Sequence, residues 1–156
     1  MKREQGYTLI EMMVALSLMC ILSAGGLYGW QSWQQQQRLW QTAVQVRDYL
    51  VMLRNDANWH RRDRLPHLEL TAQGWCLNAV SPEPTGCTPQ NVYVLNPQWP
   101  EVTLSEMTPA VGFYGLRNTA WPGHLTLKSA AGSWTLIISG WGRIRLCKGS
   151  SNEACQ

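Results

Sequence analysis

Charge is nearly absent from the first part of the sequence. Within residues 7–30 the only charged side chain is Glu11, and no proline occurs before Pro66. An uncharged run of this length can cross a bilayer core of about 30 Å, which needs roughly 20 residues. Lys2 and Arg3 precede the run, so the positive-inside rule keeps the N-terminus in the cytoplasm and sends the rest outward, in a bacterium to the periplasm. We therefore expect residues 7–30 to form a transmembrane helix.

Recognisable catalytic motifs are also missing. The sequence contains no nucleophile elbow, phosphate-binding loop, dinucleotide fingerprint or H-E-x-x-H pair. The three histidines, His60, His67 and His124, are scattered and lack the spacing of metal ligands. A net charge of +3 is too small to indicate nucleic-acid binding from bulk charge alone. We expect no enzyme activity, no cofactor and no metal.

The cysteines contain no C-x-x-C pair, which argues against a structural zinc site. Cys20 lies inside the apolar run, whereas Cys76, Cys87, Cys147 and Cys155 lie downstream. Four cysteines allow three pairings. We favour Cys76 with Cys87 and Cys147 with Cys155, because each pair closes a short local loop, and we keep zinc as the alternative. Disulfides would require an oxidising compartment.

Residues 31–58 continue the helix with an amphipathic pattern. Apolar residues step alternately by four and three positions, at Leu39, Ala43, Val46, Leu50, Leu53 and Ala57. This stripe predicts packing against a folded domain. The next segment, NWHRRDRLPH, contains the densest basic cluster, Arg61, Arg62 and Arg64. Cations at a helix C-terminus explain the cluster most simply, and contact with acidic lipid or a partner subunit is the alternative.

Beyond Pro66 the apolar period becomes two, which predicts strands. We expect eight of them, at His67–Ala72, Trp75–Val80, Val92–Leu95, Glu101–Leu104, Val111–Tyr114, His124–Ser129, Trp134–Ser139 and Arg143–Cys147. One long helix followed only by strands predicts an α+β fold, with an antiparallel sheet or small sandwich packed on the helix. Residues 59–156 would then form a periplasmic β-rich domain.

The N-terminus offers two sites for proteolytic processing. Small residues at 23–26 imitate a secretory cleavage site behind the apolar run. Gly6 offers a different site, ahead of the run, between a short basic leader of residues 1–6 and Tyr7. A cut there keeps the apolar helix in the mature protein and places a new α-amino group close to Glu11.

The stretch Gly6-Tyr7-Thr8-Leu9-Ile10-Glu11, followed by apolar residues, resembles the type IV prepilin signal. The resemblance implies that a prepilin peptidase cuts between Gly6 and Tyr7 and N-methylates the Tyr7 amine. It also implies that the Glu11 carboxylate pairs with the N-terminal amine of a neighbouring subunit during assembly. Tyr7 departs mildly from the family, in which Phe or Met is more common at the first mature position.

The strand-rich half, ending in GWGRIRLC, resembles minor pilins and pseudopilins of the GspH/FimT type. This implies a low-abundance subunit of a type IV pilus or type II secretion pseudopilus, with other minor pilins, the major pilin and the inner-membrane assembly machinery as partners. In some such proteins a G-R-x-R motif is linked to DNA binding, so Arg143 and Arg145 define an alternative function in DNA uptake. A membrane-anchored periplasmic binding domain without a filament role is the remaining alternative.

Overall fold

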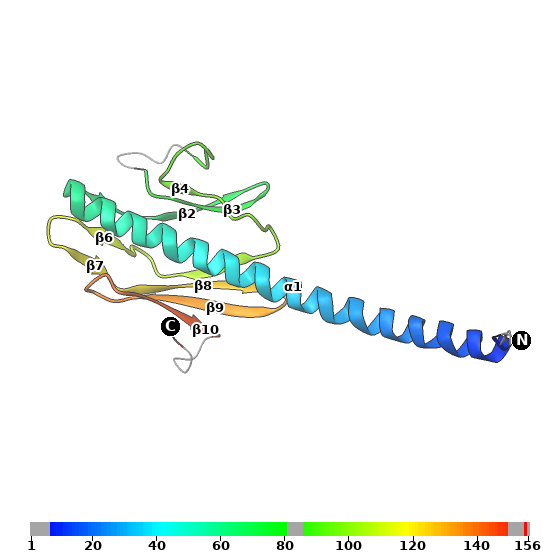
Figure 1. The fold of residues 1–156 in the computed structure, drawn as a ribbon. Helices are drawn as coiled ribbons and strands as arrows, with labels where there is room; N and C mark the ends of the chain where they lie inside the picture. Colours follow the sequence, from blue (N-terminus) through cyan, green and yellow to red (C-terminus); the bar gives the residue numbers. More distant parts are fainter. Residues whose placement is uncertain (1–6, 81–85, 150–154, 156) are drawn as a thin grey trace, which may run out of the picture. The chain divides into compact units, whose positions relative to one another are not determined.

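The computed structural model describes residues 7–80, 86–149 and 155. Its contacts divide the chain into two compact units, Met1–Gln34 and Gln35–Gln156, and each is described by itself. The secondary structure is one long helix followed only by strands (Figure 1). The predicted α+β fold is therefore confirmed.

Helix α1 spans Leu9–His60, two residues further than the predicted end at Asn58. Its part within the first unit is exposed along its whole length. The helix ends because Arg61 adopts a left-handed conformation with φ of 50°, and the Arg62 N–H donates to the Ala57 carbonyl in a helix-terminating turn. Pro66 follows within six residues of His60.

The strands form three separate antiparallel sheets, shown as arrows in Figure 1. The first has the order β1-β6-β7, the second β10-β9-β8-β5 and the third β2-β3-β4. Their bounds are β1 Asp63–Arg64, β2 His67–Thr71, β3 Gly74–Asn78, β4 Val94–Leu95, β5 Thr103–Met107, β6 Gly112–Tyr114, β7 Thr119–Trp121, β8 Gly123–Ser129, β9 Gly132–Ile138 and β10 Ile144–Lys148.

Several strand predictions need correction. Strands β1 and β7 are absent from the predicted set, since two and three residues are too few to show a period. The fourth predicted strand, Glu101–Leu104, lies at Thr103–Met107 instead. A bulge between Leu104 and Glu106 shifts the register of β5 against β8 and breaks the alternation on which the prediction rests.

The core of the second unit lies between α1 and the sheets. All six residues of the predicted apolar stripe are buried, together with Thr42 and Tyr49 from the same helix. They pack in one cluster with sheet residues such as Leu77, Phe113 and Leu136. At the end of the helix Gly115 lies so close to the Ala57 carbonyl that a Cβ there would overlap it. The packing confirms the predicted role of the stripe.

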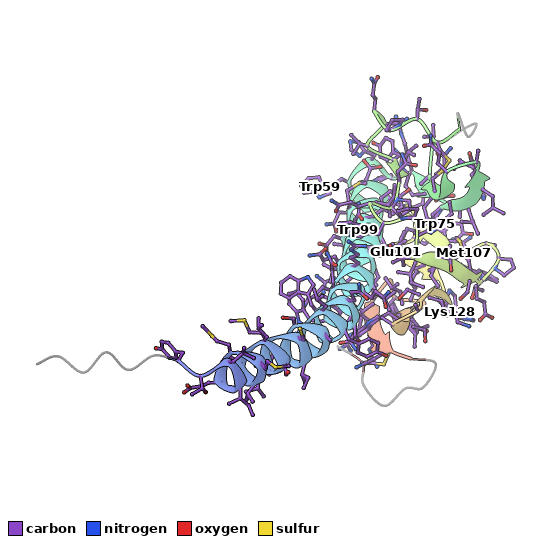
Figure 2. The ribbon with its side chains drawn as sticks, turned by 90° about the vertical axis from the view of Figure 1, so that its right-hand side faces the viewer. Trp59, Trp75, Trp99, Glu101, Met107 and Lys128 are labelled. Atoms are coloured by element: carbon purple, nitrogen blue, oxygen red, sulfur yellow. A yellow bond between two sulfur atoms is a disulfide. The ribbon has the colours of Figure 1, made fainter. Side chains whose placement is uncertain are left out.

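Two tryptophans close the core at the β3 and β5 side (Figure 2). Trp75 is buried, and its indole N–H donates to the Val102 carbonyl at 2.7 Å. The guanidinium carbon of Arg38 lies 4.4 Å from the centre of the Trp99 ring. Arg38 also forms an ion pair with Glu101, with 2.8 Å between Nη1 and Oε1. Trp59, by contrast, projects from α1 into solvent.

Candidate functional site

The residues that begin α1 form a reciprocal capping arrangement. The Thr8 hydroxyl accepts the Glu11 backbone N–H at 3.4 Å, and Glu11 Oε2 accepts the Thr8 backbone N–H at 3.4 Å. This is a capping box, in which two otherwise unpaired donors of the first helical turn are satisfied by side chains. A carboxylate at this position is also favoured by the helix dipole. Glu11 therefore stabilises the start of its own helix.

Sequence reasoning missed this capping role, although the pattern T-x-x-E that indicates a capping box is present at positions 8–11. Gly6 and the leader lie outside the described residues. Tyr7 is exposed and directly precedes Thr8, the residue that caps the helix. An amine created at Tyr7 would thus lie one residue away from the capping box.

The helix behind this site has the composition of a membrane span. One helix among the described residues is long and apolar enough to cross a bilayer, and its apolar window is not buried by any other described part of the protein. A signal sequence near an N-terminus has the same composition. The motif at the start of the span is therefore needed to distinguish an anchor from a signal sequence.

Two disulfides join the downstream cysteines. Cys76 bonds to Cys87 and Cys147 bonds to Cys155, while Cys20 is a free, exposed thiol. Each bond closes a short loop, with sequence separations of 11 and 8. The second bond lies beside a bridge between β10 and Cys155.

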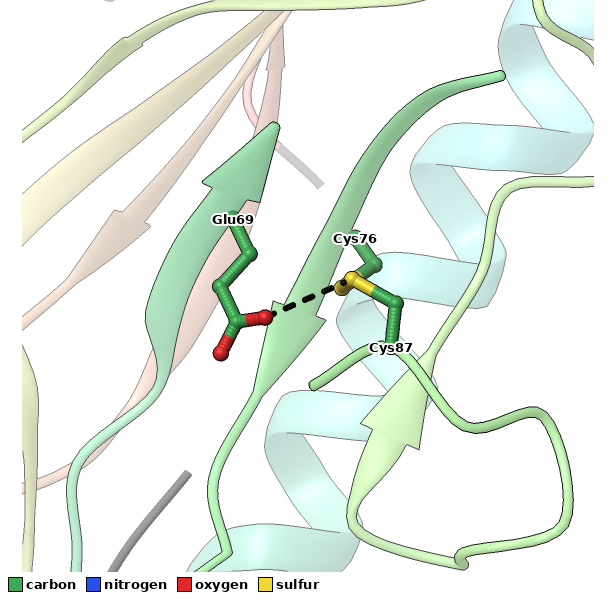
Figure 3. A group of neighbouring side chains, drawn as sticks. All are labelled: Glu69, Cys76 and Cys87. Atoms are coloured by element: carbon green, nitrogen blue, oxygen red, sulfur yellow. Dashed lines mark hydrogen bonds between the residues drawn. A yellow bond between two sulfur atoms is a disulfide. The ribbon is translucent and has the colours of Figure 1, made fainter. Parts of the chain in front are cut away.

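Glu69 lies against the first disulfide (Figure 3). Its Oε2 is 3.6 Å from Cys87 Sγ, and its Oε1 accepts a hydrogen bond from the Asn78 side chain at 3.0 Å. Glu69, Cys76 and Cys87 together have three potential ligand atoms for a metal ion. With both sulfurs bonded to each other, neither is a thiolate, and a disulfide sulfur carries no hydrogen to donate. In the oxidised protein the dashed line of Figure 3 therefore marks a polar contact.

Arg143 and Arg145 are both exposed. The predicted strand Arg143–Cys147 is shifted by one residue, because β10 spans Ile144–Lys148. Arg145 lies within β10 opposite Ile137, and Arg143 lies one residue before the strand begins. Between them Ile144 is half-buried and packs against the core. No ion pair involves either arginine among the described residues, so both guanidinium groups face solvent.

The basic cluster at the end of α1 is divided by the structure. Arg61 and Arg62 are exposed, but Arg64 lies in β1 and is buried. Its Nε is 2.6 Å from Asp56 Oδ2, and its guanidinium carbon lies 3.9 Å from the centre of the Tyr93 ring. The interpretation of all three arginines as helix-end cations is wrong for Arg64, because the chain turns back after His60 and directs it inward.

Asp56 is the centre of this partly buried network. It pairs with Arg64, accepts the Tyr93 hydroxyl at 3.1 Å and lies 3.0 Å from His60 Nδ1. Burial by itself raises the pKa of Asp56, but the hydrogen bonds from Arg64 and Tyr93 and the charges of Arg64 and His60 outweigh it, so the pKa is lowered overall. The network joins α1, β1 and the segment before β4. Sequence reasoning missed it because Asp56 and Tyr93 are 37 positions apart.

Tyr49 makes a second polar connection from α1 to the same segment. Its hydroxyl donates to the Tyr93 carbonyl at 2.7 Å and lies 3.4 Å from the Leu77 carbonyl. Burial raises the pKa of Tyr49 well above its ordinary value, and the nearby Arg64 charge opposes this only in part. The hydroxyl therefore stays protonated and serves as a structural donor.

One cluster on the open face of the second sheet has the residue types of a hydrolytic triad. Thr108 Oγ1 is 3.0 Å from His124 Nδ1, and His124 Nε2 is 3.2 Å from Glu106 Oε1. The Thr108 hydroxyl also accepts the His124 backbone N–H at 2.9 Å, which ties it to the strand. Glu106 is exposed and orients the histidine only weakly. We assign the cluster to fixing the start of β8.

Residues 1–27 match the prokaryotic N-terminal methylation motif. This match supports a type IV pilin-like protein, and the family that carries the motif is structural rather than catalytic. The apolar helix and the motif together fit a single-pass inner-membrane anchor, and the motif implies processing by a prepilin peptidase and pilus assembly machinery. No curated protein and no solved structure matches the chain.

Proposed function

We propose that the protein is a minor pilin or pseudopilin that helps to initiate or cap a type IV pilus or a type II secretion pseudopilus. The observation that carries the proposal is the coincidence of the methylation motif at residues 1–27 with a helix that begins at Leu9 and continues to His60. The disulfides agree with a domain in the periplasm. Its partners are then the major pilin, other minor pilins and the inner-membrane assembly machinery.

The chemistry starts with the cut between Gly6 and Tyr7. Hydrolysis of this peptide bond leaves an α-amino group on Tyr7, and N-methylation keeps the positive charge. In lipid an amine and a carboxylate offset part of each other's desolvation cost when they pair. The Tyr7 amine of one subunit and Glu11 of its neighbour form that pair, which favours assembled subunits over isolated ones.

The capping box allows the two roles of Glu11 to be separated. Glu11→Gln removes the charge but keeps an acceptor, and Gln serves in a capping box as Glu does. Thr8→Val removes the hydroxyl that caps the helix and keeps the charge. We expect both variants to be cleaved, but only Thr8→Val to be incorporated into filaments.

Intact-mass measurement of the membrane-extracted protein tests processing, and immunodetection in sheared filaments tests incorporation. A chain that starts at N-methylated Tyr7 supports the proposal. A chain that starts after residue 25 or 26 identifies a cleaved secretory signal instead and refutes it. Cleavage at Gly6 without any incorporation of the wild type favours the anchored binding domain. Wild-type levels of incorporation for Glu11→Gln would refute the pairing role alone.

Binding of DNA in uptake is the second candidate function. The observation that favours it is the exposure of Arg143 and Arg145, which have no acidic partner among the described residues. Two guanidinium groups are thus available to phosphates. We expect the variant Arg143→Ala/Arg145→Ala to lose binding to duplex DNA, with the difference largest at low salt. Arg61→Ala/Arg62→Ala is the matched control for two exposed charges elsewhere. Absence of binding by the wild type would exclude the function.

A further inference from the structure

Three aromatic side chains mark the end of the apolar span. Tyr28, Trp30 and Trp33 are all exposed, and the Trp30 and Trp33 rings lie 5.3 Å apart on neighbouring turns of α1. An uninterrupted run of glutamines, Gln34–Gln37, follows them. Tyr and Trp concentrate at membrane–water boundaries, because their rings are apolar and their O–H or N–H groups need a polar partner.

The spacing between these rings and Glu11 matches a bilayer. Glu11 and Trp30 are 19 positions apart on one helix, which gives a rise of about 28 Å. The hydrocarbon core is about 30 Å thick. When the rings lie in the headgroup layer on one side, Glu11 therefore lies at the boundary on the other side, and the residues between them are uncharged.

We propose that Tyr28, Trp30 and Trp33 form an aromatic anchor that binds the outer headgroup layer and fixes the depth of the helix, so that Glu11 rests at the inner boundary before assembly. The inference rests on the membrane span of the proposed function. At this depth Tyr7 and the capping box of Thr8 and Glu11 lie in the inner headgroup region.

The anchor also determines what outward movement does. Lifting the helix removes the rings from the headgroup layer and draws Glu11 into hydrocarbon, where an unpaired carboxylate is strongly disfavoured. Pairing with the amine of a neighbouring subunit relieves that cost. The bilayer thus opposes the release of a single subunit and permits the release of a paired one.

The free thiol of Cys20 allows the depth to be measured directly, because the other four cysteines are in disulfides. Cys20 lies nine positions after Glu11 and ten before Trp30. A nitroxide on Cys20 of the full chain, in phosphatidylethanolamine–phosphatidylglycerol vesicles, reports depth through its accessibility to oxygen and to a water-soluble nickel complex. We expect the label at the bilayer centre, with high oxygen and minimal nickel accessibility.

Relocation of the anchor gives a directional test. In the variant Tyr28→Ser/Trp30→Gln/Ser32→Tyr/Trp33→Gln/Gln34→Trp/Gln37→Trp all three rings move one turn along α1, so Cys20 should shift by about 6 Å toward the inner leaflet. The control Trp59→Leu/Trp141→Leu removes two exposed tryptophans from the other unit and should leave the depth unchanged.

An unchanged depth in the relocated variant, with helix content preserved by circular dichroism, would overturn the anchor and show that the apolar run alone sets the depth. The anchor would also be overturned if the nitroxide on Cys20 of the otherwise unchanged chain lay in the headgroup region. The oxygen and nickel accessibilities of the label can be measured on the unprocessed and on the processed chain. Failure of cleavage or of filament incorporation would therefore refute the proposed function without affecting this test.

Discussion

Replacement of Arg64 with methionine should destabilise the β-rich unit severely. The Arg64 side chain is 6% exposed and that of Asp56 is 12% exposed, with 2.6 Å between Nε and Oδ2. Methionine occupies much of the volume of the arginine side chain but leaves the partly buried Asp56 carboxylate with only the Tyr93 hydroxyl and the exposed His60 nearby. Removal of one partner of a buried ion pair costs about 3–5 kcal/mol.

For a folded unit of this size that loss corresponds to a Tm lower by roughly 4 °C per kcal/mol, hence by about 12–20 °C. Thermal unfolding of the full chain in detergent, followed by near-UV circular dichroism, measures it. The matched control is Asp48→Asn, which breaks the exposed pair of Arg47 and Asp48, whose side chains are 41% and 63% exposed. Such surface pairs contribute about 0–1 kcal/mol.

The double variant Asp56→Asn/Arg64→Met should recover at least half of the loss, because no charge is then buried at this site and the introduced amide still accepts from Tyr93. The reasoning is wrong if Arg64→Met unfolds within about 4 °C of the wild type. It is also wrong if the double variant is no more stable than Arg64→Met alone, since the cost would then come from packing and not from the unpaired carboxylate.

Three further predictions concern stability. The pKa of Asp56 is lowered in the folded protein. The stability that its carboxylate contributes is therefore fully present above the unfolded pKa near 3.9 and is lost as the pH falls through the folded pKa. In acid titrations below about pH 4, the Tm of Asp56→Asn should therefore fall less steeply than the Tm of the wild type. Gly115→Ala should cost about 1–3 kcal/mol or more in chemical denaturation, because its methyl group would overlap the Ala57 carbonyl; an unchanged midpoint would contradict the close approach. Cys76→Ala/Cys87→Ala should lower the free energy of unfolding by about 2–3 kcal/mol, as the bond closes a short loop, and a reductant should then have a smaller further effect than on the wild type.

Most of the architecture could be predicted from periodicity. The stripe from Leu39 to Ala57 has one repeat throughout, and its residues are buried as that repeat requires. Strands such as β8, with seven residues, show a clear alternation. The division into three sheets was not predictable, because pairing such as that of β1 with β6 depends on contacts between residues about 50 positions apart, and short strands carry no period of their own.

The candidate site shows the same division between local and distant signals. The prediction of Gly6, Tyr7 and Glu11 as processing and assembly residues rests on a contiguous motif, and this motif lies within residues 1–27, which match the N-terminal methylation motif. The capping role of Glu11 is also local, since Thr8 lies three positions away, and it could have been predicted from the same residues. The Asp56 network could not be inferred, because no local pattern indicates the inward turn of Arg64 or the position of Tyr93.

The buried stripe of α1 has a mechanical consequence. Its contacts with the sheets extend from Leu39 to Ala57, which is about 27 Å of helix. Tension along the helix axis loads these contacts in shear and in parallel, so that all of them share the force at the same time. The Asp56 network and Gly115 lie at the C-terminal end of the same helix and fix that end to β1 and to the residue after β6. A pull on α1 therefore moves the β-rich unit as one body instead of stripping the helix from it.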